Sequence, residues 1–134
     1  PFTEWKNEYS VGVPEIDAQH RRLLDIINQL HHAMKMGGKP TAIVEVINEL
    51  IGYTRYHFAY EERILEDSGY ADLEEHRRKH RAMVAQVETF RDSAAEGKAT
   101  LSLKLMGFLR DWLSKHILET DKQYSDHLAD RRAA

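Results

Sequence analysis

Residues 43–64 read IVEVINELIGYTRYHFAYEERI. One set of its side chains recurs in steps of three and four, the spacing that keeps residues on one face of an α-helix. That face comprises Ile43, Ile47, Leu50, Thr54, His57, Glu61 and Ile64. The stretch therefore predicts a helix whose apolar face also carries a histidine and a carboxylate.

Three further segments repeat the pattern, with polar residues on the apolar stripe at His20, at His76 and His80, and at His116. The segments are separated by helix-breaking sequences at Gly37-Gly38, Ser68-Gly69 and Glu96-Gly97-Lys98. Short connections favour antiparallel neighbours. We expect an all-α fold: an up-down-up-down four-helix bundle in one domain, 1–134, with helices over roughly 14–36, 40–67, 70–95 and 99–128.

The first 13 residues contain no helical periodicity and are expected to form an extended N-terminal arm. Phe2, Trp5 and Tyr9 are predicted to pack across the bundle and cover an end. Recruitment of a partner by these aromatic residues is the alternative.

Composition excludes several classes of protein. The net charge of −3 argues against a nucleic-acid partner, and the absence of cysteine rules out disulfides, thiolate metal sites and thiol nucleophiles. No apolar run approaches the roughly 20 residues that span a bilayer, so no membrane insertion is expected. The polar N-terminal residues do not resemble a signal peptide, and a cytoplasmic location is expected.

The fourth stripe is irregular between His116 and Asp121. A step of five residues turns about 140° around an ideal helix, so both side chains face the core only if the helix distorts. A π-helical turn is one such distortion, and these turns often mark functional sites. The alternative is a frayed helix end with Asp121 in solvent.

Polar groups buried on every stripe need partners, because each unpaired neutral group costs roughly 2–7 kcal/mol. A metal-free hydrogen-bond network is conceivable, but convergence from four helices favours metal coordination. The candidate ligands are His20, His57, Glu61, His76, His80, His116 and Asp121. The remaining histidines, His31, His32 and His127, lie at the edge of the stripes or off them and are expected at the surface or its boundary.

Seven ligands exceed what one ion accommodates, so two ions are expected. If Glu61 and Asp121 both bridge, and an oxo or hydroxo group bridges as well, His76, His80 and His116 complete six-coordination at one metal. The other metal, held by His20 and His57, keeps one open position for a small ligand. The donor set suits iron, manganese, copper or zinc.

Four motifs then resemble the hemerythrin family, and its single-domain bacterial members, the bacteriohemerythrins, in particular. They are VPEIDAQH (13–20), HFAYEE (57–62), HRRKH (76–80) and HILETD (116–121). The resemblance implies two iron ions (Fe²⁺/Fe³⁺) with a bridging oxo or hydroxo group, held by the seven candidate ligands, and reversible binding of dioxygen. It implies no catalytic residue and no cofactor ligand beyond those of the metals.

Reversible binding requires a dry pocket. The apolar residues next to the ligands in sequence are predicted to wall it: Leu23, Leu24, Phe58, Trp112 and Ile117. The sequence contains no Glu-x-x-His pair of the kind that carboxylate-rich di-iron proteins use. This difference favours O2 carriage, storage or delivery, with an O2-consuming enzyme as a candidate recipient. The alternatives are an oxygen or redox sensor with a separate partner, a di-iron enzyme acting on peroxide or nitric oxide, and a metal store.

Overall fold

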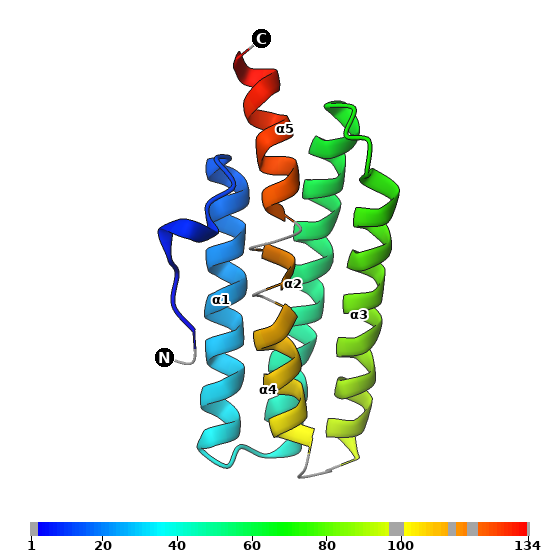
Figure 1. Cartoon of the computed structure of the whole chain (residues 1–134). Helices are drawn as coiled ribbons and strands as arrows, with labels where there is room; N and C mark the ends of the chain where they lie inside the picture. Colours follow the sequence, from blue (N-terminus) through cyan, green and yellow to red (C-terminus); the bar gives the residue numbers. More distant parts are fainter. Residues whose placement is uncertain (1–2, 97–100, 113–114, 118–120, 134) are drawn as a thin grey trace.

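The computed structural model describes residues 3–96, 101–112, 115–117 and 121–133. Within them the elements are a 3₁₀ turn, η1 (Asn7–Tyr9), and the helices α1 (Pro14–Lys35), α2 (Pro40–Asp67), α3 (Leu73–Ala95), α4 (Leu101–Trp112) and α5 (Lys122–Ala133). The first three helices stand side by side, while α4 and α5 follow one another along a single rod that completes the bundle (Figure 1). The predicted all-α four-helix bundle is confirmed.

The helix ends follow local sequence. Pro14 and Pro40 occupy the first helical position of α1 and α2, where their missing N–H group costs nothing. Gly37 and Gly69 follow the helix ends with φ of +70° and +73°, a conformation in which glycine is not strained.

Two predicted boundaries differ from the structure. The third helix begins at Leu73 and not near residue 70, because the turn after Ser68 continues to Asp72. The fourth predicted helix, 99–128, is divided into α4 and α5. Its first two residues and the Gly97-Lys98 break lie outside the described residues.

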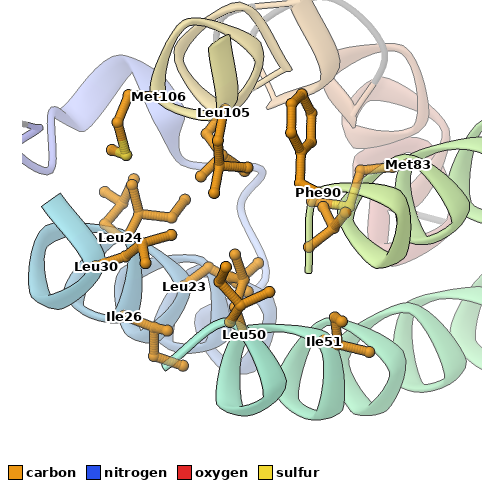
Figure 2. Packing of buried hydrophobic residues seen from close by; sticks show 14 of the residues in the cluster. Leu23, Leu24, Ile26, Leu30, Leu50, Ile51, Met83, Phe90, Leu105 and Met106 are labelled. Carbon is orange, nitrogen blue, oxygen red and sulfur yellow. The ribbon is translucent and has the colours of Figure 1, made fainter. Parts of the chain in front are cut away.

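The larger hydrophobic cluster fills the half of the bundle near the α1–α2 connection. Figure 2 shows its side chains meeting from all sides: Leu23, Leu24, Ile26 and Leu30 from α1, Leu50 and Ile51 from α2, Met83 and Phe90 from α3, and Leu105 and Met106 from α4. All ten are less than a tenth exposed. This packing fixes the rotation of each helix about its axis.

A second, smaller cluster lies at the other end of the bundle. It consists of Val11, Val13, Ile16, Leu65, Tyr124 and Leu128. Along α1 the chain passes from Ile16 in this cluster, through His20, to Leu23 in the larger one. On α2 the order is reversed, with Glu61 lying between Phe58 and Leu65. The polar stripe residues therefore form a layer between two apolar clusters.

The N-terminal arm lies along the side of α1 (Figure 1). Thr3 and Asn28 exchange two hydrogen bonds, of 2.9 and 2.8 Å, through the Thr3 backbone and the Asn28 amide. Trp5 and Tyr9 pack against the larger cluster, and the Arg21 guanidinium lies 4.5 Å from the Trp5 ring centroid. The two aromatic residues thus cover the side of the bundle and not its end. Phe2 lies outside the described residues.

None of the helices, over their described residues, combines the length and apolar character that a membrane span requires.

Candidate metal centre

The seven candidate ligands converge in the layer between the two clusters. His20 comes from α1, His57 and Glu61 from α2, His76 and His80 from α3, and His116 and Asp121 from the segment between α4 and α5. None is more than 4 % exposed. These side chains therefore face the core together, as the sequence predicts.

Glu61 divides its two oxygens between two sets of histidines. Its Oε1 lies 2.5 Å from His76 Nε2 and 3.0 Å from His80 Nε2. Its Oε2 lies 3.2 Å from His57 Nε2 and 3.7 Å from His20 Nε2. One carboxylate thus faces two separate groups of imidazoles.

Asp121 makes the same division. Its Oδ1 lies 3.0 Å from His116 Nε2 and 3.3 Å from His76 Nε2, whereas its Oδ2 lies 3.3 Å from His20 Nε2. Taken with Glu61, this arrangement defines a three-histidine group (His76, His80 and His116) and a two-histidine group (His20 and His57). The two carboxylates lie between the groups.

A local distortion of the helix brings Asp121 into the core. Residues 115–117 and Asp121 are π-helical, with α4 ending before them and α5 beginning after them. The wider π turn aligns residues five apart, which the step from His116 to Asp121 requires. Asp121 is fully buried, so the alternative of a frayed end with this carboxylate in solvent is wrong.

The polar side-chain atoms that face the centre are better placed to bind a cation than to form hydrogen bonds with one another. Among the described residues, the Nε2 atoms of His20, His57, His80 and His116 and both oxygens of Asp121 are buried without a hydrogen-bond partner. Two sets of potential ligand atoms lie within 4.8 Å of one another: Glu61 with His76, His80 and His116, and Glu61 with His20 and His57. A metal-free network would leave these polar atoms unsatisfied at considerable cost.

The electrostatics agree with a cation site. Burial lowers the pKa of His20, but the Asp121 and Glu61 carboxylates outweigh burial and raise it to about 9. The pKa of His76 is raised to about 9 for the same reasons. At His57 burial prevails over contact with Glu61 and lowers the pKa. Burial raises the pKa of each carboxylate, yet the surrounding imidazoles lower both well below their usual range, so Glu61 and Asp121 are ionised.

Three side chains outside the predicted set contact the ligands. Gln19 Oε1 lies 2.8 Å from His57 Nδ1, Glu62 Oε2 lies 2.8 Å from His80 Nδ1, and the Tyr124 hydroxyl donates to Glu61 Oε2 over 3.0 Å. Gln19 and Glu62 each adjoin a ligand in sequence, and Tyr124 continues the stripe of Asp121. Adjacency to a ligand, or a place on its stripe, was the only feature of the sequence that pointed to these three residues.

Two predicted wall residues lie against the three-histidine group. The Phe58 ring stacks on His80 with centroids 3.6 Å apart, and Trp112 stacks on His116 at 4.8 Å. The other three, Leu23, Leu24 and Ile117, are buried in the larger cluster.

Two surface grooves reach the three-histidine group. A groove of about 670 Å³ between α3 and α4 includes Trp112 and His116 in its lining. A groove of about 340 Å³ between α2 and α3 includes Phe58 and His80. Solvent therefore comes close to this side of the centre.

The other three histidines lie apart from the centre. His32 is exposed, and His31 and His127 are half-buried. His127 Nε2 lies 3.0 Å from the Ser68 carbonyl oxygen, at the far end of α2. Their surface and boundary positions agree with the sequence prediction.

The family model for the hemerythrin HHE cation binding domain matches residues 11–128. The chain belongs to the hemerythrin family. It is 38 % identical over 122 residues to a bacteriohemerythrin of Pseudomonas aeruginosa (strain LESB58), covering 91 % of this chain and 78 % of that protein. It is 32 % identical over 126 residues to a bacteriohemerythrin of Clostridium acetobutylicum, covering 91 % and 98 %.

Solved hemerythrin structures share the fold. A crystal structure of wild-type hemerythrin superimposes with a TM-score of 0.83 at 28 % identity, covering 96 % of this chain and 98 % of that one. The crystal structure of a hemerythrin mutant gives 0.81 at the same identity, covering 94 % and 96 %. The His/Glu cluster of this chain is thus the metal-binding cluster of a hemerythrin four-helix bundle.

Proposed function

We propose that this hemerythrin-family chain holds two iron ions and binds dioxygen reversibly. The observation that carries the proposal is the division of the carboxylate oxygens. Each of Glu61 and Asp121 turns one oxygen to the three-histidine group and the other to the two-histidine group. Carboxylates placed in this way would each bridge two bound cations.

The numbers of ligands differ between the two positions. His76, His80 and His116, with one oxygen from each carboxylate and a bridging oxo or hydroxo group, would provide six donors to one iron. His20 and His57, with the same three bridges, would provide five to the other. One coordination position would then be left for a small ligand on the side of the two-histidine group.

When bound, the iron pair supplies the electrons that O2 accepts on binding and returns on release. The chain's own residues keep water away from this exchange. Leu23 and Leu24 are 1 % and 3 % exposed and follow His20 by one turn, and Ile117, which is 1 % exposed, belongs to the same hydrophobic cluster. We propose that these three wall the ligand pocket, while Phe58 and Trp112 shield the three-histidine group from the grooves.

A binding role is favoured over an enzymatic one. Among the described residues in contact with the carboxylates and imidazoles of the centre, the polar groups outside the ligand set are Gln19, Glu62 and Tyr124. Each of them already contacts a ligand, so none is poised as an acid or base for a substrate. Carriage, storage or delivery of O2, with an O2-consuming enzyme as recipient, is the role that we propose.

The direct test is repeated oxygenation. The iron-loaded protein is reduced without air, exposed to O2, and then freed of O2 while its visible spectrum is followed. A charge-transfer band that appears and disappears over several cycles is the expected result. Irreversible oxidation in the first cycle with turnover of an added substrate contradicts carriage and favours an enzyme, and zinc alone in protein from iron-replete cells contradicts both.

A further inference from the structure

The outer nitrogens of two histidines meet partners of different charge. His57 and His80 both turn Nε2 inward to Glu61, at 3.2 and 3.0 Å. With Nε2 facing the metal position, Nδ1 carries the proton and donates outward. His57 donates to the neutral amide of Gln19, whereas His80 donates to the carboxylate of Glu62, in each case over 2.8 Å.

Glu62 is held in place from its other side. Arg77 Nε donates to Glu62 Oε1 over 3.2 Å, which leaves Oε2 directed at His80. Arg77 is also shared with Glu66 and Glu74, at 3.1 and 2.5 Å. Since one guanidinium serves three carboxylates, it orients Glu62 without cancelling the negative charge beside His80.

A carboxylate that accepts the outer proton of an imidazole makes that imidazole a stronger donor to its metal. A stronger donor stabilises the more highly charged oxidation state. An amide oxygen accepts the same hydrogen bond without a formal charge, so its effect is smaller. The negative charge of Glu62 therefore favours the higher oxidation state at the three-histidine position, and the two-histidine position lacks such a charge.

We propose that Glu62 and Gln19 add to the difference that unequal numbers of ligands create between the two metal positions, so that the iron held by the three-histidine group is oxidised first. This inference rests on the proposed function, because it presupposes two irons. In the one-electron step, an outer-sphere oxidant such as ferricyanide takes one electron from the diferrous protein and becomes ferrocyanide. The iron at the open position stays ferrous, and Glu62 acts as a positioning residue for His80.

The test compares the parent with Glu62→Gln, Gln19→Glu and the double variant. The separation between the two one-electron reduction potentials should narrow in Glu62→Gln, because the negative charge beside His80 is lost. The Glu62→Gln variant should also bind Zn²⁺ roughly 10- to 100-fold more weakly than the parent, and this measurement does not require iron. Glu49→Gln is the matched control, because Glu49 is a glutamate of the same helix that pairs with Arg22 and not with Arg77, and it should leave both quantities unchanged.

Azide identifies which iron is ferric in the half-oxidised protein, because it binds a ferric ion with an open position. We expect azide to bind the half-oxidised double variant more tightly than the half-oxidised parent, since the charges beside His80 and His57 are exchanged there.

Equal potentials in the parent, or potentials that neither single variant moves, would overturn the inference. If the inference is overturned in this way but the parent protein still binds O2 reversibly, the proposed function stands. If the parent protein never holds two irons, both the inference and the proposed function fail. If Glu62→Gln fails to load iron, Gln19→Glu alone must still narrow the separation.

Discussion

The hydroxyl of Tyr124 donates a hydrogen bond of 3.0 Å to Oε2 of Glu61, and both side chains are completely buried. Tyr124 belongs to the smaller apolar cluster, so this contact ties that cluster to the carboxylate at the centre of the bundle. Burial and the nearby carboxylates raise the pKa of Tyr124 well above its ordinary value, and the phenol therefore remains a donor at neutral pH.

Tyr124→Phe should weaken the metal-free protein while preserving the bundle. A hydrogen bond to a charged group is worth about 1.5–3 kcal/mol, and we expect the free energy of unfolding to fall by that amount. Urea denaturation measures it. Tyr56→Phe, at a position 56 % exposed, is the control and should change stability little. Equal stabilities of the two variants would show that the Tyr124 contact contributes nothing.

His116→Ala should reduce the iron content below two ions per chain and lower the melting temperature of the loaded protein, because metal binding contributes to folding free energy. His32→Ala, at an exposed histidine, is the control. Metal analysis and thermal unfolding check the pair. A His116→Ala variant that keeps two irons and an unchanged visible spectrum removes this residue from the ligand set.

Leu24→Ser should accelerate autoxidation by admitting water to the ligand pocket. Leu30→Ser changes the same residue type in the same helix and cluster, further from His20. Each variant should lose about 2–5 kcal/mol of stability, as large-to-small core substitutions do. Only Leu24→Ser should shorten the lifetime of the oxygenated protein, measured as decay of its visible band. Similar lifetimes for both variants would exclude Leu24 from the wall.

Thr54→Val should stabilise the protein. Thr54 is 1 % exposed, one turn before His57, and its hydroxyl is buried without a hydrogen-bond partner among the described residues. Replacing an unpaired hydroxyl by a methyl of similar shape should gain about 1 kcal/mol. In Thr89→Val, by contrast, a hydrogen bond to the Ala85 carbonyl is lost at an exposed position, and no gain is expected. A loss of stability in Thr54→Val would mean that its hydroxyl has a partner.

The metal-free protein should become less stable as the pH rises from 7 to 9. His20 and His76 have a pKa of about 9 in the folded protein, against 6.5 when unfolded. The folded state therefore holds more protons in this range, so the stabilisation that is complete below pH 6.5 is lost towards pH 9. His57, with its lowered pKa, is neutral in both states above pH 7 and does not contribute.

Denaturant titrations at several pH values test this dependence. In the metal-loaded protein the imidazoles are held neutral by the ions, and the decline should disappear. Stability of the metal-free protein that stays constant or rises over this range contradicts the pKa assignment.

Periodicity was sufficient to predict the bundle and the inward position of the seven side chains. A stripe in steps of three and four fixes which face of a helix is buried. The five-residue step from His116 to Asp121 could be reconciled with that rule through a π turn, and the described residues of this turn have that geometry.

Contacts between helices were less predictable. Phe58 adjoins His57 in sequence but stacks on His80, since its direction depends on how α2 is rotated against α3. The hydrogen bonds of Gln19 and Glu62 likewise depend on side-chain rotamers set by packing. The start of α3 at Leu73 depends on turn geometry after Ser68, which the stripe does not encode.

We propose that Glu61 and Asp121 bridge two irons, with three histidines on one and two on the other. The most direct measurement is a crystal structure of the iron-loaded protein, with anomalous scattering collected at the iron edge. We expect two iron peaks between these carboxylates, with His76, His80 and His116 on one iron and His20 and His57 on the other. A single peak, or an Asp121 side chain turned away from both ions, would contradict it.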